Sequence, residues 1–216
     1  MTLDALNFWL AIAGTVAFAV TAVLAIADRG VDIFGVIVLG VITAVGGGTV
    51  RDIILDVPIF WASDLVFVRV AVVSSILAFV ARKFFTQPQI FTLMIYIDGL
   101  GAALFGMNGA LKTWELDFAW PLGPIILGVI TAIGGGIIRD VIVGRKTLIM
   151  STEVYAVPVA LGCVLMMWLM LFFPEHKSRV LLSCTVFSFA MRAAAIHWNW
   201  QMPAFLVTKS RKTWSD

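Results

Sequence analysis

One phrase of the sequence occurs twice, and this repeat constrains the fold more than any other feature. Residues 35–52 read GVIVLGVITAVGGGTVRD, and residues 123–140 read GPIILGVITAIGGGIIRD. In each copy a strongly apolar run leads into three consecutive glycines and then into an Arg-Asp pair. The repeat predicts a chain of two similar halves that place their glycine triplets at matching positions.

The composition around the repeat is that of an integral membrane protein. Of 216 residues, 61% are hydrophobic and 13% are charged, whereas about 25% of the residues in a soluble domain are charged. The net charge of +2 is small and scattered along the chain, so no nucleic-acid partner is expected. Cys163 and Cys184 lie inside apolar runs without metal-ligand spacing, so we expect no metal site and no disulfide.

Windows of about 20 apolar residues predict an all-α protein with seven transmembrane helices. Only short polar or proline-marked connections separate these windows, so residues 1–216 are expected to form a single membrane domain that ends in a polar, frayed tail at 209–216. The predicted spans are Leu6–Ala27, Ile33–Leu55, Leu65–Ala81, Ile90–Leu111, Trp120–Val143, Val154–Phe173 and Val180–His197.

The similarity of the two halves extends beyond the glycine phrase. Residues 14–21 in the first span align with residues 101–108 in the fourth, so repeat one covers about 5–85, repeat two covers about 90–174, and an extra helix follows at about 180–197. Because each repeat has three spans, the second must enter the membrane from the opposite side. Such an inverted three-plus-three repeat is typical of transporters and some channels.

The distribution of Lys and Arg predicts the orientation in the membrane. If the N-terminus is outside, the inner loops contain Arg29, Arg82, Lys83, Arg145 and Lys146, together with the basic residues of the tail. Positive residues are enriched on the cytoplasmic side of membrane proteins. We therefore expect the N-terminus outside and the C-terminus in the cytoplasm.

The glycine triplets are expected to interrupt the second and fifth helices. One glycine within a helix costs about 1 kcal/mol relative to alanine, so three in a row favour a kink, a bulge or local unwinding. Paired interruptions in inverted halves indicate a permeation or binding site. The alternative is that the glycines allow close packing of helices. The residues concerned are Gly46, Gly47, Gly48, Gly134, Gly135 and Gly136.

Polar residues beside the triplets are candidates for the lining of a pathway. Thr43 and Thr131 lie three residues before each triplet, where their hydroxyls either face an ion or bond to their own helix. The pairs Arg51-Asp52 and Arg139-Asp140 follow the triplets. A charge at membrane depth costs at least about 2.5–3.5 kcal/mol, so we expect these residues to form ion pairs, to reach the interface, or to face water in two vestibules or at a gate.

Four more residues are candidates for the pathway. Asp98 lies within the fourth span, where its carboxylate needs water, a cation or a donor such as Tyr96 or an arginine of the other repeat. Asn108 lies further along the same span. Phe18 and Phe105 occupy matching positions in the two repeats and form either an apolar constriction or part of the core.

No sequence motif points to catalysis. The chain contains no Walker loop, HExxH, GxSxG or cysteine cluster. The stretch GGGTVRD lacks the Lys-Ser/Thr of a phosphate-binding loop and lies within an apolar span. We expect a protein that is not an enzyme and has no cofactor, with permeant K⁺ or Na⁺ as its only ions.

Seven spans, an inverted repeat and GGGTVRD at Gly46–Asp52 echoed by GGGIIRD at Gly134–Asp140 resemble the prokaryotic branch of the trimeric intracellular cation (TRIC) channel family. The resemblance covers nearly the whole chain. It implies a homotrimer in the lipid of a prokaryotic inner membrane, with a pore in each protomer between the kinked second and fifth helices that passes monovalent cations, chiefly K⁺. The two Arg-Asp pairs would supply the vestibule charges. The chain lacks the lysine-rich KEV-type motif of the animal members, which argues against lipid regulation of the animal kind.

A second hypothesis comes from a different functional class. Bacterial relatives of this family have also been linked to the transport of small amino acids. Half-helix N-termini at broken helices bind carboxylates in secondary transporters. The chain is therefore either a cation channel or a secondary transporter of a small zwitterion such as glycine, and the residues alone do not separate the two.

Overall fold

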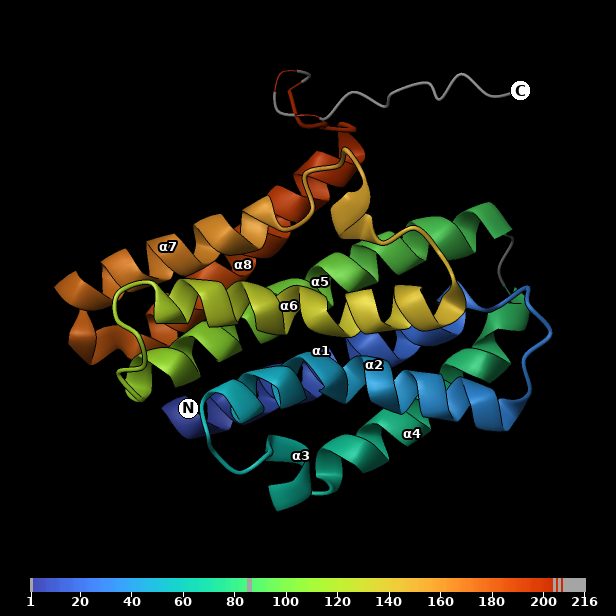
Figure 1. Cartoon of the computed structure of the whole chain (residues 1–216), viewed down its shortest axis with the longest axis horizontal. Coiled ribbons are helices and arrows are strands. Elements are labelled where there is room, and N and C mark those ends of the chain that lie inside the picture. The colour runs from blue at the N-terminus through green and yellow to red at the C-terminus, as the bar shows by residue number, and fades with distance from the viewer. Residues whose placement is uncertain (1, 85–86, 204, 206, 208–216) are drawn as a thin grey trace, which may run out of the picture.

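The structure, a computed structural model, describes residues 2–84, 87–203, 205 and 207. The predicted tail at 209–216 lies outside these residues. The regular secondary structure of the described part is helical apart from one isolated bridge between Glu153 and Gln201, and turns and irregular segments connect the helices, as Figure 1 shows. Its elements are α1 (Leu3–Ala25), α2 (Ile33–Ile54), α3 (Phe60–Ser63), α4 (Val66–Ala81), η1 (Arg82–Phe84), α5 (Gln87–Glu115), α6 (Gly123–Val143), η2 (Leu148–Met150), α7 (Val157–Phe172), η3 (Pro174–His176) and α8 (Lys177–His197).

The helix ends follow from local chemistry. Thr2 and Asp32 cap the start of α1 and α2, because their side chains accept hydrogen bonds from backbone N–H groups three residues later. Pro124 and Pro158 lie in the first turns of α6 and α7, where a missing N–H costs nothing. Gly144 ends α6 with a φ of 67°, a left-handed conformation that glycine adopts without strain.

The prediction of seven long helices in an all-α membrane protein is confirmed. The predicted spans correspond to α1, α2, α4, α5, α6, α7 and α8. Among the described residues, five helices are long and apolar enough to cross a membrane. The helices α4 and α7 have 16 residues each, which is about 24 Å at 1.5 Å per residue. The short helix α3 was not predicted.

The two halves of the bundle are inverted relative to each other. In Figure 1, α1 and α5 run in opposite directions, and so do α2 and α6. The first helices of the two repeats, α1 and α5, pack together, as do the second helices, α2 and α6, while α8 packs on α5 and α7. We call the end at which α1 begins the N-terminal end and the other end the opposite end.

The glycine triplets do not interrupt their helices. Both α2 and α6 are continuous α-helices through the triplets, so the predicted bulge or local unwinding is wrong. The reason is the helix crossing, because a Cβ atom on Gly47 would overlap the carbonyl oxygen of Thr131, and one on Gly135 would overlap that of Thr43. The triplets let two backbones touch, which is the close-packing alternative.

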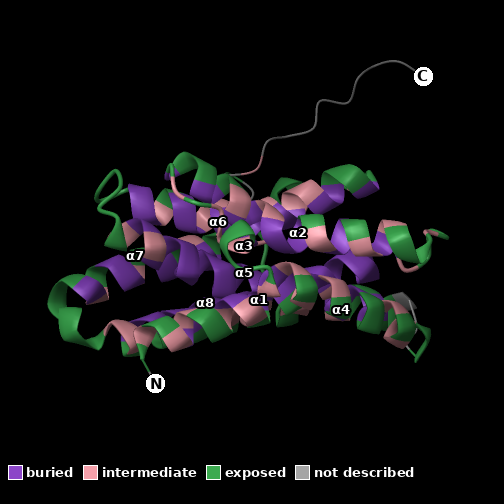
Figure 2. Cartoon of the chain, turned by 90° about the horizontal axis from the view of Figure 1, so that it is seen from below, coloured by how far each residue is buried: buried purple, intermediate pink, exposed green. Residues whose placement is uncertain are grey.

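The distribution of burial fits a lipid-facing bundle. Figure 2 shows buried residues on the helix faces that point to the centre and exposed residues on the outer faces. The exposed residues include many large hydrophobic side chains, such as Leu77, Trp168 and Phe172. An apolar outer surface of this extent is what a membrane-embedded protein presents to lipid. The polar residues discussed next lie inside this shell.

Candidate functional site

The middle of the bundle is filled by apolar and backbone groups. Phe18 and Phe105 stack with ring centroids 5.6 Å apart and an interplanar angle of 14°, and both are buried. The matching glycines give each ring its place, because a Cβ on Gly14 would come within 2.8 Å of Phe105, and one on Gly101 within 3.4 Å of Phe18. Since α2 and α6 also touch at their triplets, the predicted passage between these two helices is closed in this conformation.

The two threonines beside the triplets do not offer their hydroxyl protons to this region. Thr43 donates to the carbonyl of Leu39 at 2.7 Å, and Thr131 donates to that of Leu127 at 2.5 Å. Both side chains are buried. Of the two interpretations, the structure shows the bond to the residue's own helix.

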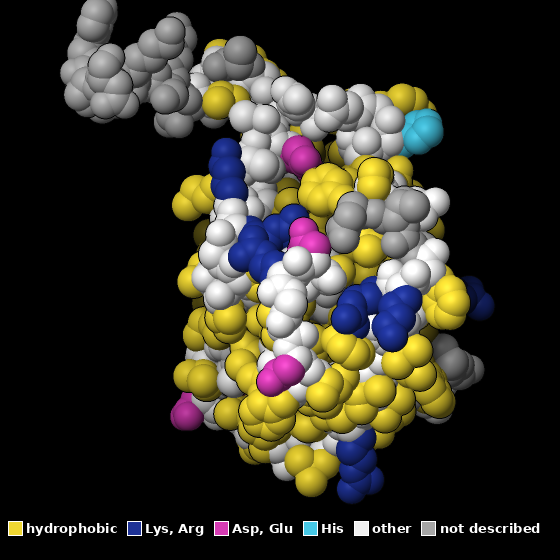
Figure 3. All heavy atoms as spheres, turned by 90° about the vertical axis from the view of Figure 1, so that its right-hand side faces the viewer, with side chains coloured by type: hydrophobic (Ala, Val, Ile, Leu, Met, Phe, Trp, Pro, Cys, Tyr) yellow, Lys and Arg dark blue, Asp and Glu magenta, His cyan; other side chains and the backbone are white. Residues whose placement is uncertain are grey.

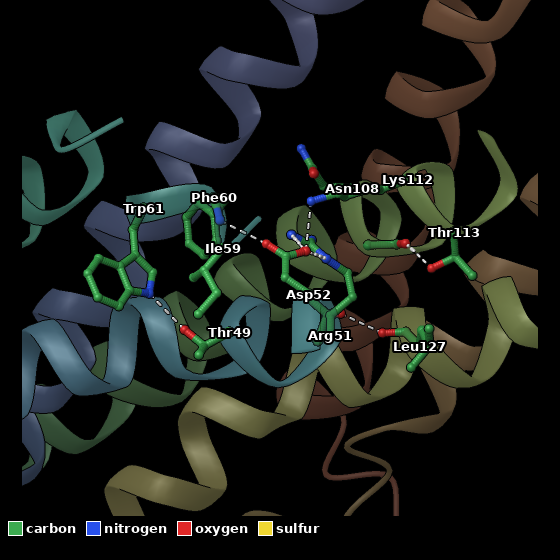
Figure 4. Close-up of polar contacts among 12 residues, drawn as sticks. Thr49, Arg51, Asp52, Ile59, Phe60, Trp61, Asn108, Lys112, Thr113 and Leu127 are labelled. Carbon is green, nitrogen blue, oxygen red and sulfur yellow. Dashed lines mark hydrogen bonds and ion pairs between the residues drawn. The ribbon is translucent and has the colours of Figure 1, made fainter. Parts of the chain in front are cut away.

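At the N-terminal end, a group of side chains that we call the Arg51 cluster surrounds Asp52 (Figure 4). The Nε and Nη2 atoms of Arg51 and the Nζ atom of Lys112 all lie 2.7–2.8 Å from Oδ1 of Asp52. The backbone N–H of Phe60 in α3 donates to Oδ2 at 2.9 Å. Two cations thus face one carboxylate, and Arg51 and Asp52 are 3% and 0% exposed.

A cavity of about 230 Å³ adjoins the Arg51 cluster. Its polar lining consists of Asp4, Asn7, Arg51, Asn108 and Lys112, and its apolar lining includes phenylalanines of α1, α3, α4 and α5. The amide of Asn108 donates to the backbone and side-chain oxygens of Asn7 at 3.1 and 2.7 Å. The cavity reaches Phe105, one of the two stacked rings in the centre.

At the opposite end, the Arg139 cluster has a different set of partners. Nη1 of Arg139 donates to Oδ1 of Asp98 at 2.6 Å and to the hydroxyl of Thr21 at 2.9 Å, and Nε donates to Asp140 at 2.8 Å. Tyr155 donates to the second oxygen of Asp98 at 2.7 Å. One cation faces two carboxylates here, and both Arg139 and Asp98 are fully buried.

The expected partners of Asp98 were wrong. Its cation, Arg139, belongs to the same repeat and not to the other one, since α5 and α6 are neighbours in repeat two. Its hydroxyl donor is Tyr155. Tyr96 instead lines a shallow surface groove near the start of α5.

Contacts from α8 hold Tyr155 over the Arg139 cluster. Arg192 donates to the carbonyl of Val154 at 3.0 Å and to Glu153 at 3.2 Å, and its guanidinium lies 5.2 Å from the centre of the Tyr155 ring. The chain after α8 adds a backbone bond from Met202 to the segment before α7. The segment between α6 and α7 therefore closes the opposite end.

Sequence reasoning did not select Lys112, Phe60, Tyr155 or Asn7. One available signal was helical spacing, because Lys112 lies four residues after the candidate Asn108 and so projects from the same face of α5. A second signal was the repeat, because Tyr155 lies 20 residues after Gly135, as Phe67 lies 20 residues after Gly47.

A protein-family model described as "Glycine transporter" matches the chain twice, at residues 8–83 and 95–170. The inner membrane protein YadS of Escherichia coli (strain K12), designated UPF0126, is 37% identical over 208 residues, which cover 95% of this chain and 99% of YadS. The chain belongs to the glycine transporter family, which is the prokaryotic TRIC-like family.

Solved structures of TRIC channels share the fold of this glycine transporter family member. The TRIC orthologue from Rhodobacter sphaeroides has a TM-score of 0.83 at 29% identity, with 90% of this chain and 98% of that chain covered. A prokaryotic TRIC channel crystallised in 0.5 M KCl has a TM-score of 0.82 at 30% identity, with 91% and 96% covered. The resemblance drawn from the doubled GGGxxRD motif is confirmed.

Proposed function

We propose that this protein is a channel for monovalent cations, K⁺ among them, with a pathway inside each protomer. The observation that carries the proposal is the likeness, over nine tenths of the chain, to one structure described as a trimeric intracellular cation channel orthologue and one described as a prokaryotic TRIC channel. The arrangement of the polar groups supports it. Arg51 and Arg139 each lie four residues beyond the central glycine of a triplet, so the two clusters flank the α2–α6 crossing by about 6 Å on either side.

The proposed pathway runs beside the α2–α6 crossing and not through it. It starts in the N-terminal cavity, passes the stacked Phe18 and Phe105, and leaves past the Arg139 cluster. In the conformation described, the rings and the buried Arg139 cluster close it. Conduction requires the rings to separate and the Tyr155–Asp98 hydrogen bond to open, while the triplets at the crossing keep the two repeats in contact.

The assembly and orientation are part of the same proposal. One matched protein is described as a trimeric intracellular cation channel, which favours a homotrimer here. Figure 3 looks onto the opposite end, where basic side chains lie among hydrophobic ones. The loops at this end contain Arg29, Arg82, Lys83, Arg145 and Lys146, which favours a cytoplasmic location. A reporter fused to the C-terminus is expected to be cytoplasmic, and a periplasmic reporter signal would reverse the orientation.

The test of the channel is a current. Purified protein in planar bilayers is expected to give K⁺ single-channel currents, and a bulky replacement of Gly47 or Gly135 is expected to abolish or strongly alter them. Absence of single-channel currents together with saturable glycine uptake into proteoliposomes would overturn the channel.

That second outcome corresponds to a secondary transporter of glycine, which the description of the family model favours. The structure changes how such a transporter would bind its substrate. Because α2 and α6 are continuous, they present no half-helix termini to a carboxylate. A side-chain site would be required instead.

A further inference from the structure

Helix α8 is the one long helix that lies outside the two repeats, and it packs on α5 and α7 of repeat two (Figure 1). Near its end, at the opposite end of the bundle, α8 contains Arg192, which is 2% exposed. A buried arginine within a membrane-spanning helix is energetically expensive and is by default a candidate for a function. The contacts of Arg192 indicate what that function is.

The guanidinium group of Arg192 holds the segment that carries Tyr155. Its Nη1 donates to the backbone carbonyl of Val154 at 3.0 Å, and its Nη2 donates to Oε2 of Glu153 at 3.2 Å. Its centre lies 5.2 Å from the centre of the Tyr155 ring, within the range in which an aromatic face attracts a cation. One side chain of α8 thus contacts three consecutive residues of an irregular segment.

The aliphatic stem of Arg192 crosses the helix that carries Asp98. A Cβ atom on Gly99 would come within 2.7 Å of Cγ of Arg192, so the glycine leaves the stem its place against α5. Gly99 directly follows Asp98, which accepts the 2.7 Å hydrogen bond from Tyr155. Arg192 therefore contacts the chain on both sides of the Tyr155–Asp98 hydrogen bond, and we call its contacts with Gly99 and with residues 153–155 the Arg192 clamp.

The chain after α8 is joined to the same segment. Gln201 forms a bridge with Glu153, and the backbone N–H of Met202 donates to the carbonyl of Thr152 at 2.8 Å. A displacement of α8 or of residues 200–202 therefore acts directly on the segment that carries Tyr155.

Within the part of the chain that the structure describes, repeat one has no equivalent of the Arg192 clamp. The residue that matches Gly99 is Ile12, since each lies two residues before a matching glycine, Gly101 or Gly14. The helix that follows repeat one is α5, which already belongs to repeat two. The clamp is therefore confined to the opposite end.

We infer that Arg192 is a positioning residue, which holds the hydroxyl of Tyr155 within hydrogen-bonding reach of Asp98 and so makes α8 the element that controls the opposite end. Withdrawal of Arg192 frees Tyr155, and the Tyr155–Asp98 hydrogen bond then opens. This inference rests on the proposed channel and adds to it the helix that sets its closure.

The first test measures the accessibility of Tyr155 and needs no current. The chain contains two tyrosines, of which Tyr155 is 4% exposed and Tyr96 is half-buried in a surface groove. Nitration of the full-length protein in detergent with tetranitromethane, followed by mass spectrometry, therefore reports on Tyr155 with Tyr96 as an internal standard. Arg192→Gln is expected to raise the nitration rate of Tyr155 at least about tenfold, the value of one charge-assisted hydrogen bond, and to leave the rate of Tyr96 unchanged.

The second test measures the open probability of the channel in planar bilayers with K⁺. Arg192→Gln is expected to raise the open probability while the single-channel current stays the same. Arg192→Lys keeps the positive charge but lacks the fork that reaches Val154 and Glu153 together, so it should give an intermediate open probability. In the Tyr155→Phe background, Arg192→Gln should add little, because both changes act on one hydrogen bond; a full further increase would overturn the inference.

The matched control is Arg179→Gln, which makes the same replacement at an exposed residue in the first turn of α8 and is expected to leave both measurements at their wild-type values. If Arg192→Gln fails to fold, Glu153→Ala decides, because the Glu153 side chain is 36% exposed and its replacement removes one partner of Arg192. A wild-type nitration rate of Tyr155 in the folded variant overturns the inference, and so does an equal change in Arg179→Gln. Absence of K⁺ currents from the wild-type protein contradicts the proposed channel instead, and nitration then still decides whether Arg192 positions Tyr155.

Discussion

Alanine at Gly47 and at Gly46 should have opposite consequences, although the two glycines are neighbours in one helix. A Cβ atom on Gly47 would overlap the carbonyl oxygen of Thr131, which belongs to the backbone of α6 and cannot rotate away. A Cβ atom on Gly46 would come within 2.7 Å of Cδ1 of Ile138, the tip of a side chain that can change its rotamer. Only the first change forces α2 and α6 apart.

The expected difference in stability between the two variants comes only from the energetic effects that they do not share. Both gain about 1 kcal/mol of helix propensity when glycine becomes alanine, so this gain cancels in the comparison. Overpacking of a tight contact costs about 1–3 kcal/mol, and it applies to Gly47→Ala alone. At about 2–4 °C per kcal/mol for a chain of this length, Gly47→Ala should melt about 2–12 °C below Gly46→Ala.

The assay is thermal unfolding of the two purified variants in the same detergent, followed by the loss of the folded peak in size-exclusion chromatography. Gly135→Ala should behave as Gly47→Ala does, since its Cβ would overlap the carbonyl oxygen of Thr43. The double variant should lose less than the sum of the two single losses, because both act on one crossing. A melting temperature of Gly47→Ala equal to or above that of Gly46→Ala would refute the role assigned to the triplets.

Three further predictions concern the Tyr155–Asp98 hydrogen bond, the stacked rings and the two cysteines. Tyr155→Phe removes the 2.7 Å hydrogen bond to Asp98 and should destabilise the closed conformation by about 1–3 kcal/mol. The open probability of the channel in bilayers should therefore rise, and an unchanged open probability would contradict the proposed closure. Phe105→Ala should cost about 3–5 kcal/mol of stability and increase the single-channel current, whereas a reduced current would contradict a constriction. Cys163 and Cys184 are buried and unpaired. A membrane-impermeant maleimide should therefore not label the folded protein, and a reductant should not change its melting temperature. Labelling of the native protein would contradict this packing.

The fold was predictable from the sequence because each helix has a local signal. Apolar windows of about 20 residues gave the spans, and the doubled motif gave the inverted repeat. The bulge or unwinding expected at the triplets was wrong because helix propensity counts only the cost to an isolated helix. The compensating contact, the backbone of α6 against Gly47, involves a residue far away in the sequence, and tertiary packing overrides local propensity when two backbones fit this closely.

The partners of Asp98 were missed for a related reason. The predicted partner was an arginine of the other repeat, but α5 and α6 form an antiparallel hairpin within repeat two. Residues at equal distances from such a turn lie side by side. Asp98 is 17 residues before the end of α5 at Glu115, and Arg139 is 16 residues after the start of α6 at Gly123, so counting from the turn would have paired them. The hydroxyl of Tyr155 follows no such rule, because its segment between η2 and α7 is irregular.

The difference between the two ends also bears on the path that we propose for a cation. On the proposed pathway, a cation that enters from the N-terminal end passes a cavity that Asp4 lines and then Arg51 and Lys112, which share the carboxylate of Asp52 and repel it. Beyond the stacked rings it meets the Arg139 cluster, where carboxylates are in excess. The unfavourable part of this profile is therefore located at the cavity.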